Sequence, residues 1–173
     1  MKRIKQEDIQ FNSNAISLAG EFAALSQLSL RGFDANMTLG HTKGVDILIS
    51  DPNTGKMFKM EVKTHHGTKT ATSKLFGHCI EWVMADKHEE IVDPTLFYCF
   101  VYIELPSKTF RYFIVPSKEV ARYVKDQHSY YLTKRNTKTT IMRKFRIGLD
   151  DKGYDIETPL AKDYENNWNF SID

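Results

Sequence analysis

The chain has 173 residues, of which 41% are hydrophobic and 12% aromatic. This composition excludes wholesale disorder, and the length suits a single domain, residues 1–173, with little room for a second hydrophobic core. The apolar runs are far too short to span a bilayer, and no apolar segment follows the basic N-terminal residues, so we expect a cytoplasmic protein without membrane contact. The net charge of +2 points to no partner by itself.

The first predicted element is a helix over residues 14–30. Asn12 or Ser13 is available as its N-cap, and Gly32 is available to end it. Glu21 lies within the apolar stripe of this helix, which consists of Leu18, Leu25 and Leu28. Because an unpaired buried charge is very costly, Glu21 needs a salt bridge, a hydrogen bond, a proton or a metal ion. A structural salt bridge is the ordinary explanation.

A hairpin is predicted next. Two apolar runs, 45–49 and 58–63, flank a Pro-Asn-Thr-Gly turn signal and are typical of adjacent antiparallel strands. With the turn centred between residues 53 and 54, Asp46 pairs directly with Glu61. Directly opposed residues point to the same side of a sheet with Cβ atoms about 4.5–5.5 Å apart, close enough for two carboxylates to share a divalent cation. Lys63 is two residues further on, so it shares that side.

An exposed sheet face explains such alternation equally simply, since acids and lysines are the default on the solvated side of a hairpin. Two observations favour a functional site. Asp46 interrupts an otherwise branched aliphatic strand. An acidic pair opposed across strands is also destabilising unless a cation lies between its members.

These features together resemble the PD-(D/E)xK nuclease superfamily, which includes many restriction endonucleases and Holliday-junction resolvases. The resemblance covers about residues 13–115 and depends on an acid in the first helix, Asp46, a spacer of fourteen residues, and the Glu61-Val62-Lys63 triplet. Val45 stands where the family name has proline, a position that carries no chemistry. The family implies a restriction-endonuclease-like fold, in which helices flank a central mixed sheet.

The resemblance also implies metal-assisted hydrolysis of phosphodiester bonds. Asp46, Glu61 and the backbone carbonyl of Val62 would hold Mg²⁺, with Mn²⁺ as a substitute, because oxygen ligands suit these ions. Glu21 would hold a second ion or a metal-bound water. Lys63 would orient or deprotonate the attacking water, or stabilise the transition state. DNA is the expected substrate, whereas RNA, the target structure, the biological role and a homodimer remain open.

The second half of the chain is predicted from shorter signals. We expect a polar loop over 65–72, a helix over 73–91, strands over 96–105 and 110–115, and a helix from 117 to about 125. The resulting order of helices and strands is that of a mixed α/β or α+β protein. No element is assigned beyond residue 127.

Charge is unevenly distributed along the chain. Two segments, 62–80 and 127–149, lack acids, whereas 150–173 is mainly acidic. The acid-free segments are candidate phosphate contacts, although solvated basic loops have the same composition. The acidic segment is expected to turn away from such contacts or to pack on a basic face. The candidate contacts are Lys69, Lys74, Lys134, Arg135, Lys138, Arg143 and Lys144.

Histidines near the motif are further candidates. His65 and His66 follow Lys63 directly, but no His or Cys at regular spacing completes a zinc site, so a loop that touches substrate is the better prediction. His41 and Lys43 precede the Asp46 strand and are equally consistent with a phosphate contact or an exposed loop.

Two other function classes remain from the sequence. The first is a nucleic-acid-binding module that has a nuclease fold without catalysis. The second is a protein-interaction domain, in which Glu21 is salt-bridged and the basic segments bind no nucleic acid.

Overall fold

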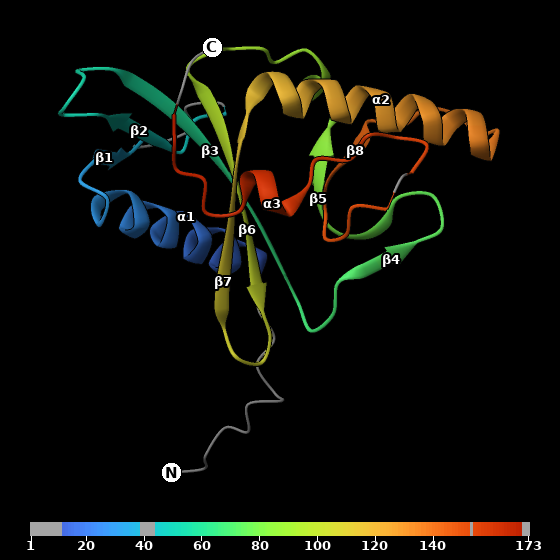
Figure 1. Cartoon of the computed structure of the whole chain (residues 1–173), viewed down its shortest axis with the longest axis horizontal. Coiled ribbons are helices and arrows are strands. Elements are labelled where there is room, and N and C mark those ends of the chain that lie inside the picture. The colour runs from blue at the N-terminus through green and yellow to red at the C-terminus, as the bar shows by residue number, and fades with distance from the viewer. Residues whose placement is uncertain (1–11, 39–43, 153, 171–173) are drawn as a thin grey trace, which may run out of the picture.

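The computed structural model describes residues 12–38, 44–152 and 154–170 and contains two sheets (Figure 1). The larger sheet has the strand order β1-β2-β3-β6-β7. Its β3 and β6 strands run parallel and its other neighbours antiparallel, so the mixed α/β prediction is confirmed. Its strands are β1 (Asp34–Met37), β2 (Ile47–Ser50), β3 (Met57–Gly67), β6 (Leu96–Glu104) and β7 (Thr109–Pro116).

A smaller sheet and the helices complete the fold. The smaller sheet has the order β4-β5-β8 and is antiparallel. Its strands are β4 (Ala71–Ser73), β5 (Gly77–Ala85) and β8 (Met142–Gly148). The helices are α1 (Ser13–Ser29), the 3-10 turn η2 (Asp86–Glu89), α2 (Ser117–Arg135) and the short α3 (Ala161–Tyr164).

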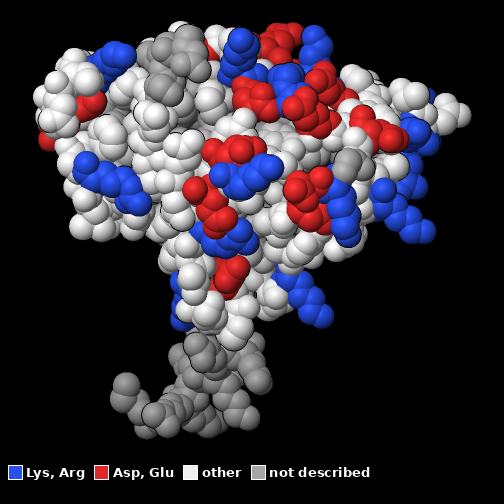
Figure 2. Space-filling model, viewed as in Figure 1, with Lys and Arg blue, Asp and Glu red and all other residues white. Residues whose placement is uncertain are grey.

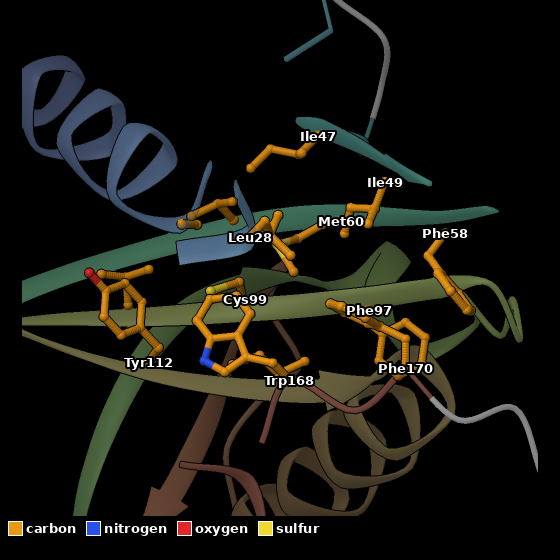
Figure 3. Close-up of a cluster of buried hydrophobic side chains, with 14 of the residues drawn as sticks. Leu28, Ile47, Ile49, Phe58, Met60, Phe97, Cys99, Tyr112, Trp168 and Phe170 are labelled. Carbon is orange, nitrogen blue, oxygen red and sulfur yellow. The ribbon is translucent and has the colours of Figure 1, made fainter. Parts of the chain in front are cut away.

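The large sheet is covered on both sides. On one side α1 packs over β1, β3 and β6 and closes the core of Figure 3, which contains Leu28, Ile47, Met60 and Cys99. On the other side the small sheet and α2 cover β6 and β7. The second core alternates with the first along β6, because successive residues of a strand point to opposite faces. It includes Tyr98, Phe100, Trp82, Tyr123 and Phe145.

The first helix forms close to its predicted bounds. Asn12 is the N-cap, and its side chain accepts a hydrogen bond from the Asn14 N–H (2.9 Å). The buried face, however, is made by Ile16, Gly20, Ala24 and Leu28. Leu18 was predicted to belong to the apolar stripe, but 48% of its surface is exposed.

The predicted helix over 73–91 is wrong. This segment forms β4, β5 and η2. Within it Ile80, Trp82 and Met84 are buried at every second position, and they face the larger sheet while β5 pairs with β8. Pairing with a strand about sixty residues further along the chain therefore outweighs the helix-forming residues around it.

Other boundaries also differ from the prediction. β3 continues through His65 and His66 to Gly67, so only part of the predicted loop over 65–72 is a loop. α2 extends ten residues beyond the predicted end, to Arg135, and β1 and β8 were not predicted. Among the described residues, no helix is both long and apolar enough to cross a membrane.

The acidic C-terminal segment packs against the rest of the molecule. Trp168 and Phe170 lie in the α1 core, where Phe170 contacts the rings of Phe58 and Phe97 (Figure 3). Glu165 receives two hydrogen bonds from the Arg111 guanidinium (2.7 and 2.9 Å). The segment therefore completes the core beneath the β2–β3 hairpin.

Candidate active site

The hairpin has the predicted register. Ile47 pairs with Met60 and Ser50 with Met57, as the turn position requires. The ladder ends at Ile47, because the Asp46 N–H donates to the Met60 carbonyl (2.8 Å), the residue that Ile47 already faces. Two residues of one strand thus meet one residue of the other, as in a β-bulge, which redirects the side chain at that point.

Beyond the end of the backbone ladder, the side chain of Asp46 bonds β3 in place of the backbone. Its Oδ2 accepts a hydrogen bond from the Val62 N–H (2.7 Å). Burial raises the pKa of Asp46 above its ordinary value, this hydrogen bond opposes the rise, and the nearby Glu61 carboxylate adds to it. Asp46 is therefore held at β3, beside a second acid.

Glu61 lies deeper and is paired. Only 3% of its surface is exposed, and its Oε1 lies 2.5 Å from Lys63 Nζ and 3.5 Å from His88 Nε2. Burial alone raises the pKa of Glu61, but the contacts with His88 and Lys63 outweigh it and hold this pKa at about 2. Its second oxygen, Oε2, is buried and has no hydrogen-bond partner within the part of the chain that the structure describes. A Cβ at Gly44 would lie 3.4 Å from that oxygen.

Glu21 reaches the same group of charges from α1. Burial raises the pKa of Glu21, the Asp46 carboxylate raises it further, and the Lys63 ammonium lowers it. No ion pair of Glu21 occurs within the described part of the chain, so the salt bridge that would give it a purely structural role is not formed there. The three acids and Lys63 are thus electrostatically coupled.

A close approach of α1 to β3 brings Glu21 into this group. A Cβ at Gly20 would lie 2.0 Å from Thr64 Oγ1, so only glycine lets the helix pass this near to the strand. Glu21 follows Gly20 directly, and Thr64 follows Lys63. The same contact that packs the helix therefore sets the position of its acid.

The carboxylates of Asp46 and Glu61 suit a hard divalent cation that keeps several water ligands. Among the described residues, Oε2 of Glu61 has no hydrogen-bond partner, and the pKa values of Asp46 and Glu21 are raised. A bound cation would offset the negative charge of these carboxylates. Within the described ranges, no three His, Cys, Asp or Glu side chains gather closely enough to hold a metal. Mg²⁺ commonly takes one or two carboxylates and keeps several waters, which suits Asp46 and Glu61 with Glu21 further out.

Sequence reasoning missed His88 and Tyr98. Both are buried, and their rings meet edge to face at 5.9 Å beside Glu61. Tyr98 is the residue that Glu61 faces across the parallel β3–β6 pair. Tyr98 lies in a predicted strand that is apolar along almost its whole length, which was a usable signal for its burial. His88 had no such signal, because its segment was predicted as helix.

Of the predicted contacts near the motif, His65 and His66 lie at the end of β3. His65 is exposed and stacks on Tyr102 with ring centroids 5.8 Å apart, and His66 follows it in the same strand. His41 and Lys43 lie outside the described residues. The phosphate contacts of these four residues stay a prediction.

The two acid-free segments meet where Cys79 and Ile80 of β5 pair with Gly148 and Ile147 of β8. Several of their cations are neutralised internally. Arg143 is buried and bonds Glu89, Lys144 bonds Glu81, and Lys134 lies 3.6 Å from Asp155. In the face shown in Figure 2, acidic and basic side chains alternate, with basic ones along the right-hand edge. Lys69, Lys74, Arg135 and Lys138 are exposed.

Comparison with known proteins supports a nuclease-like fold. The structure is similar to that of the bacterial homing endonuclease I-Ssp6803I, with a TM-score of 0.55, 13% sequence identity and coverage of 91% of each chain. No family model and no curated protein matches the sequence. At this identity the likeness concerns the fold alone.

Proposed function

We propose that the chain is a metal-dependent nuclease of the PD-(D/E)xK type that hydrolyses phosphodiester bonds of DNA, acting as an endonuclease. The observation that carries the proposal is the coupled group formed by Glu21, Asp46, Glu61 and Lys63 on a fold similar to that of a homing endonuclease. Perturbed acids gathered around one lysine are typical of functional sites.

Each residue has a definite task in this proposal. Asp46 and Glu61, with the Val62 carbonyl, would hold Mg²⁺, and Glu21 would act through a water molecule. Mg²⁺, when bound, would polarise the phosphate and make a water molecule more acidic. Lys63 would orient the attacking water or stabilise the negative charge that develops on the phosphate. The products would carry a 5′-phosphate and a 3′-hydroxyl, as the family resemblance implies.

Cleavage assays on the full chain test this proposal. Linear, supercoiled, single-stranded and branched DNA should all be offered with Mg²⁺ or Mn²⁺, and EDTA should stop the reaction. We expect Lys63→Ala to abolish cleavage while metal and DNA binding persist. Asp46→Ala should remove both metal binding and cleavage, because it deletes a ligand.

Lys59→Ala provides the matched control, since Lys59 lies in the same strand but pairs with Asp93 at 2.9 Å. It should cut like the wild type. Binding without cleavage of every substrate would favour the silent module instead, and neither binding nor cleavage would favour the interaction domain.

A further inference from the structure

His88 lies beside the candidate site on an element that none of the proposed catalytic residues belongs to. It sits in η2, between β5 and β6, with 3% of its surface exposed. Its ring packs edge to face on Tyr98, at 5.9 Å between centroids. A polar ring buried this deeply needs partners for its nitrogens.

Both ring nitrogens face a partner. Nδ1 lies 3.1 Å from the Ala85 nitrogen and 2.9 Å from the Ala85 carbonyl oxygen, and Nε2 lies 3.5 Å from Oε1 of Glu61. A carboxylate that is ion-paired with Lys63 has only acceptor sites, so Nε2 bonds it as a protonated donor. Nδ1 accepts from the Ala85 N–H in the neutral ring and donates to the Ala85 carbonyl in the doubly protonated ring. One nitrogen therefore anchors the ring to the backbone, and the other points a donor at Glu61.

Two donors meet the same oxygen of Glu61, and the Tyr98 hydroxyl, whose pKa is raised by burial and by the Glu61 carboxylate, lies beside that carboxylate. Lys63 Nζ lies 2.5 Å and His88 Nε2 lies 3.5 Å from Oε1, whereas Oε2 has no hydrogen-bond partner among the described residues. A carboxylate held at one oxygen from two directions cannot rotate freely about its terminal bond. The arrangement thus presents Oε2 as the available ligand atom.

We propose that His88 is a positioning residue, which fixes the Glu61 carboxylate so that Oε2 is directed at a divalent cation. The inference rests on the proposed function, because it assigns Glu61 the task of a metal ligand. Groups that orient metal ligands commonly change metal affinity about 10–100-fold when they are removed. His88 would not touch the substrate.

A purely structural role is the alternative, since the Ala85 contact closes the start of η2. Two substitutions separate the roles. His88→Asn keeps an acceptor near the position of Nδ1 and loses the donor to Glu61. His88→Gln keeps a donor near the position of Nε2 and loses the contact with Ala85.

The test measures Mn²⁺ affinity of the full chain by calorimetry or electron paramagnetic resonance, together with the thermal midpoint and cleavage. We expect His88→Asn to weaken Mn²⁺ binding about 10-fold or more and to lower kcat with little change in KM for DNA. His88→Gln should stay within about threefold of wild-type affinity although its thermal midpoint falls.

Trp82→Phe serves as a stability control, because it removes the buried hydrogen bond from Trp82 Nε1 to the Val101 carbonyl (3.0 Å), away from Glu61. It should lower the thermal midpoint and leave Mn²⁺ affinity unchanged. Wild-type Mn²⁺ affinity in His88→Asn, or equal weakening in both His88 variants, would overturn the positioning role.

The proposed function and the role of His88 can fail separately. A wild-type protein that binds Mn²⁺ but cuts no DNA refutes the nuclease, while the affinities of the two variants still decide about His88. A wild-type protein that cuts DNA, with cleavage and Mn²⁺ affinity unchanged in His88→Asn, refutes His88 alone. Absence of Mn²⁺ binding in the wild type overturns both.

Discussion

Three carboxylates belong to the candidate site, and their environments shift their pKa values in opposite directions. The pKa of Glu61 lies at about 2, because Lys63 and His88 outweigh the effect of burial. The pKa values of Glu21 and Asp46 are raised, first by burial and then by neighbouring carboxylates. Glu61 therefore carries a compensated charge, whereas Glu21 and Asp46 carry charges that the protein alone does not balance.

This imbalance predicts a stability effect at Glu21. An acid with a raised pKa in the folded state favours folding when protonated, so its contribution worsens as pH rises from the ordinary value, 4.5, through the raised one. In EDTA above that window, we expect Glu21→Gln to raise the thermal midpoint relative to the wild type. With Mn²⁺ present, the variant should gain less stability than the wild type.

Thermal unfolding from pH 4 to 8, with EDTA or Mn²⁺, measures this effect, and Glu90→Gln is a control at an exposed position. A lower midpoint for Glu21→Gln in EDTA at neutral pH would show that Glu21 is engaged in a stabilising interaction instead. That result would favour a structural salt bridge as the role of Glu21.

At the scale of elements, the contact between α1 and β3 positions the site. A Cβ at residue 20 would overlap Thr64 Oγ1, at 2.0 Å, although alanine is otherwise the better helix former by about 1 kcal/mol. We expect Gly20→Ala to lower the free energy of unfolding by about 1–3 kcal/mol, the usual cost of overpacking. Urea unfolding measures the change, and the displaced helix should also reduce Mn²⁺ affinity.

The partner substitution checks that explanation. Gly20→Ala combined with Thr64→Ala should recover part of the lost stability, because the nearest atom is removed. Ser26→Ala, at an exposed position of the same helix, should cost little. No recovery in the double variant would mean that the loss arises elsewhere.

Across the whole molecule, the basic segments are the open question. Arg143 and Lys144 are engaged with Glu89 and Glu81, so their charge serves the contact between β5, β8 and η2. Lys134 pairs loosely with an exposed acid, and Arg135 and Lys138 are exposed near the end of α2. The latter three are therefore the better candidates for DNA contact.

Contact of Lys134, Arg135 and Lys138 with DNA can be detected from the salt dependence of DNA binding. If the three cations contact phosphates, replacing all three by alanine should reduce the slope of log affinity against log salt by about 0.9 for each contact. Fluorescence anisotropy over a range of salt concentrations measures the slope. The matched variant replaces three lysines outside both segments, Lys56, Lys118 and Lys162, and should change the slope less. If both variants change the salt slope equally, the basic residues at the end of α2 are solvated and do not contact DNA.

The sequence by itself determined the helix that begins after Asn12, the hairpin register and the order of Glu21, Asp46, Glu61 and Lys63. These follow from local signals, namely a cap, a turn and the alternation of a strand, which act over a few residues. The mixed sheet was also expected correctly from the order of elements and the family resemblance.

Only the tertiary structure decided the rest. Residues 77–85 became β5 because β8 supplies a pairing edge and β6 an apolar surface, and no local pattern encodes a partner so distant. That change placed His88 against Glu61. It also left Arg143 and Lys144 paired with acids. Trp168 and Phe170 reached the α1 core for the same reason, since burial of large rings depends on a surface that exists only once the chain has folded.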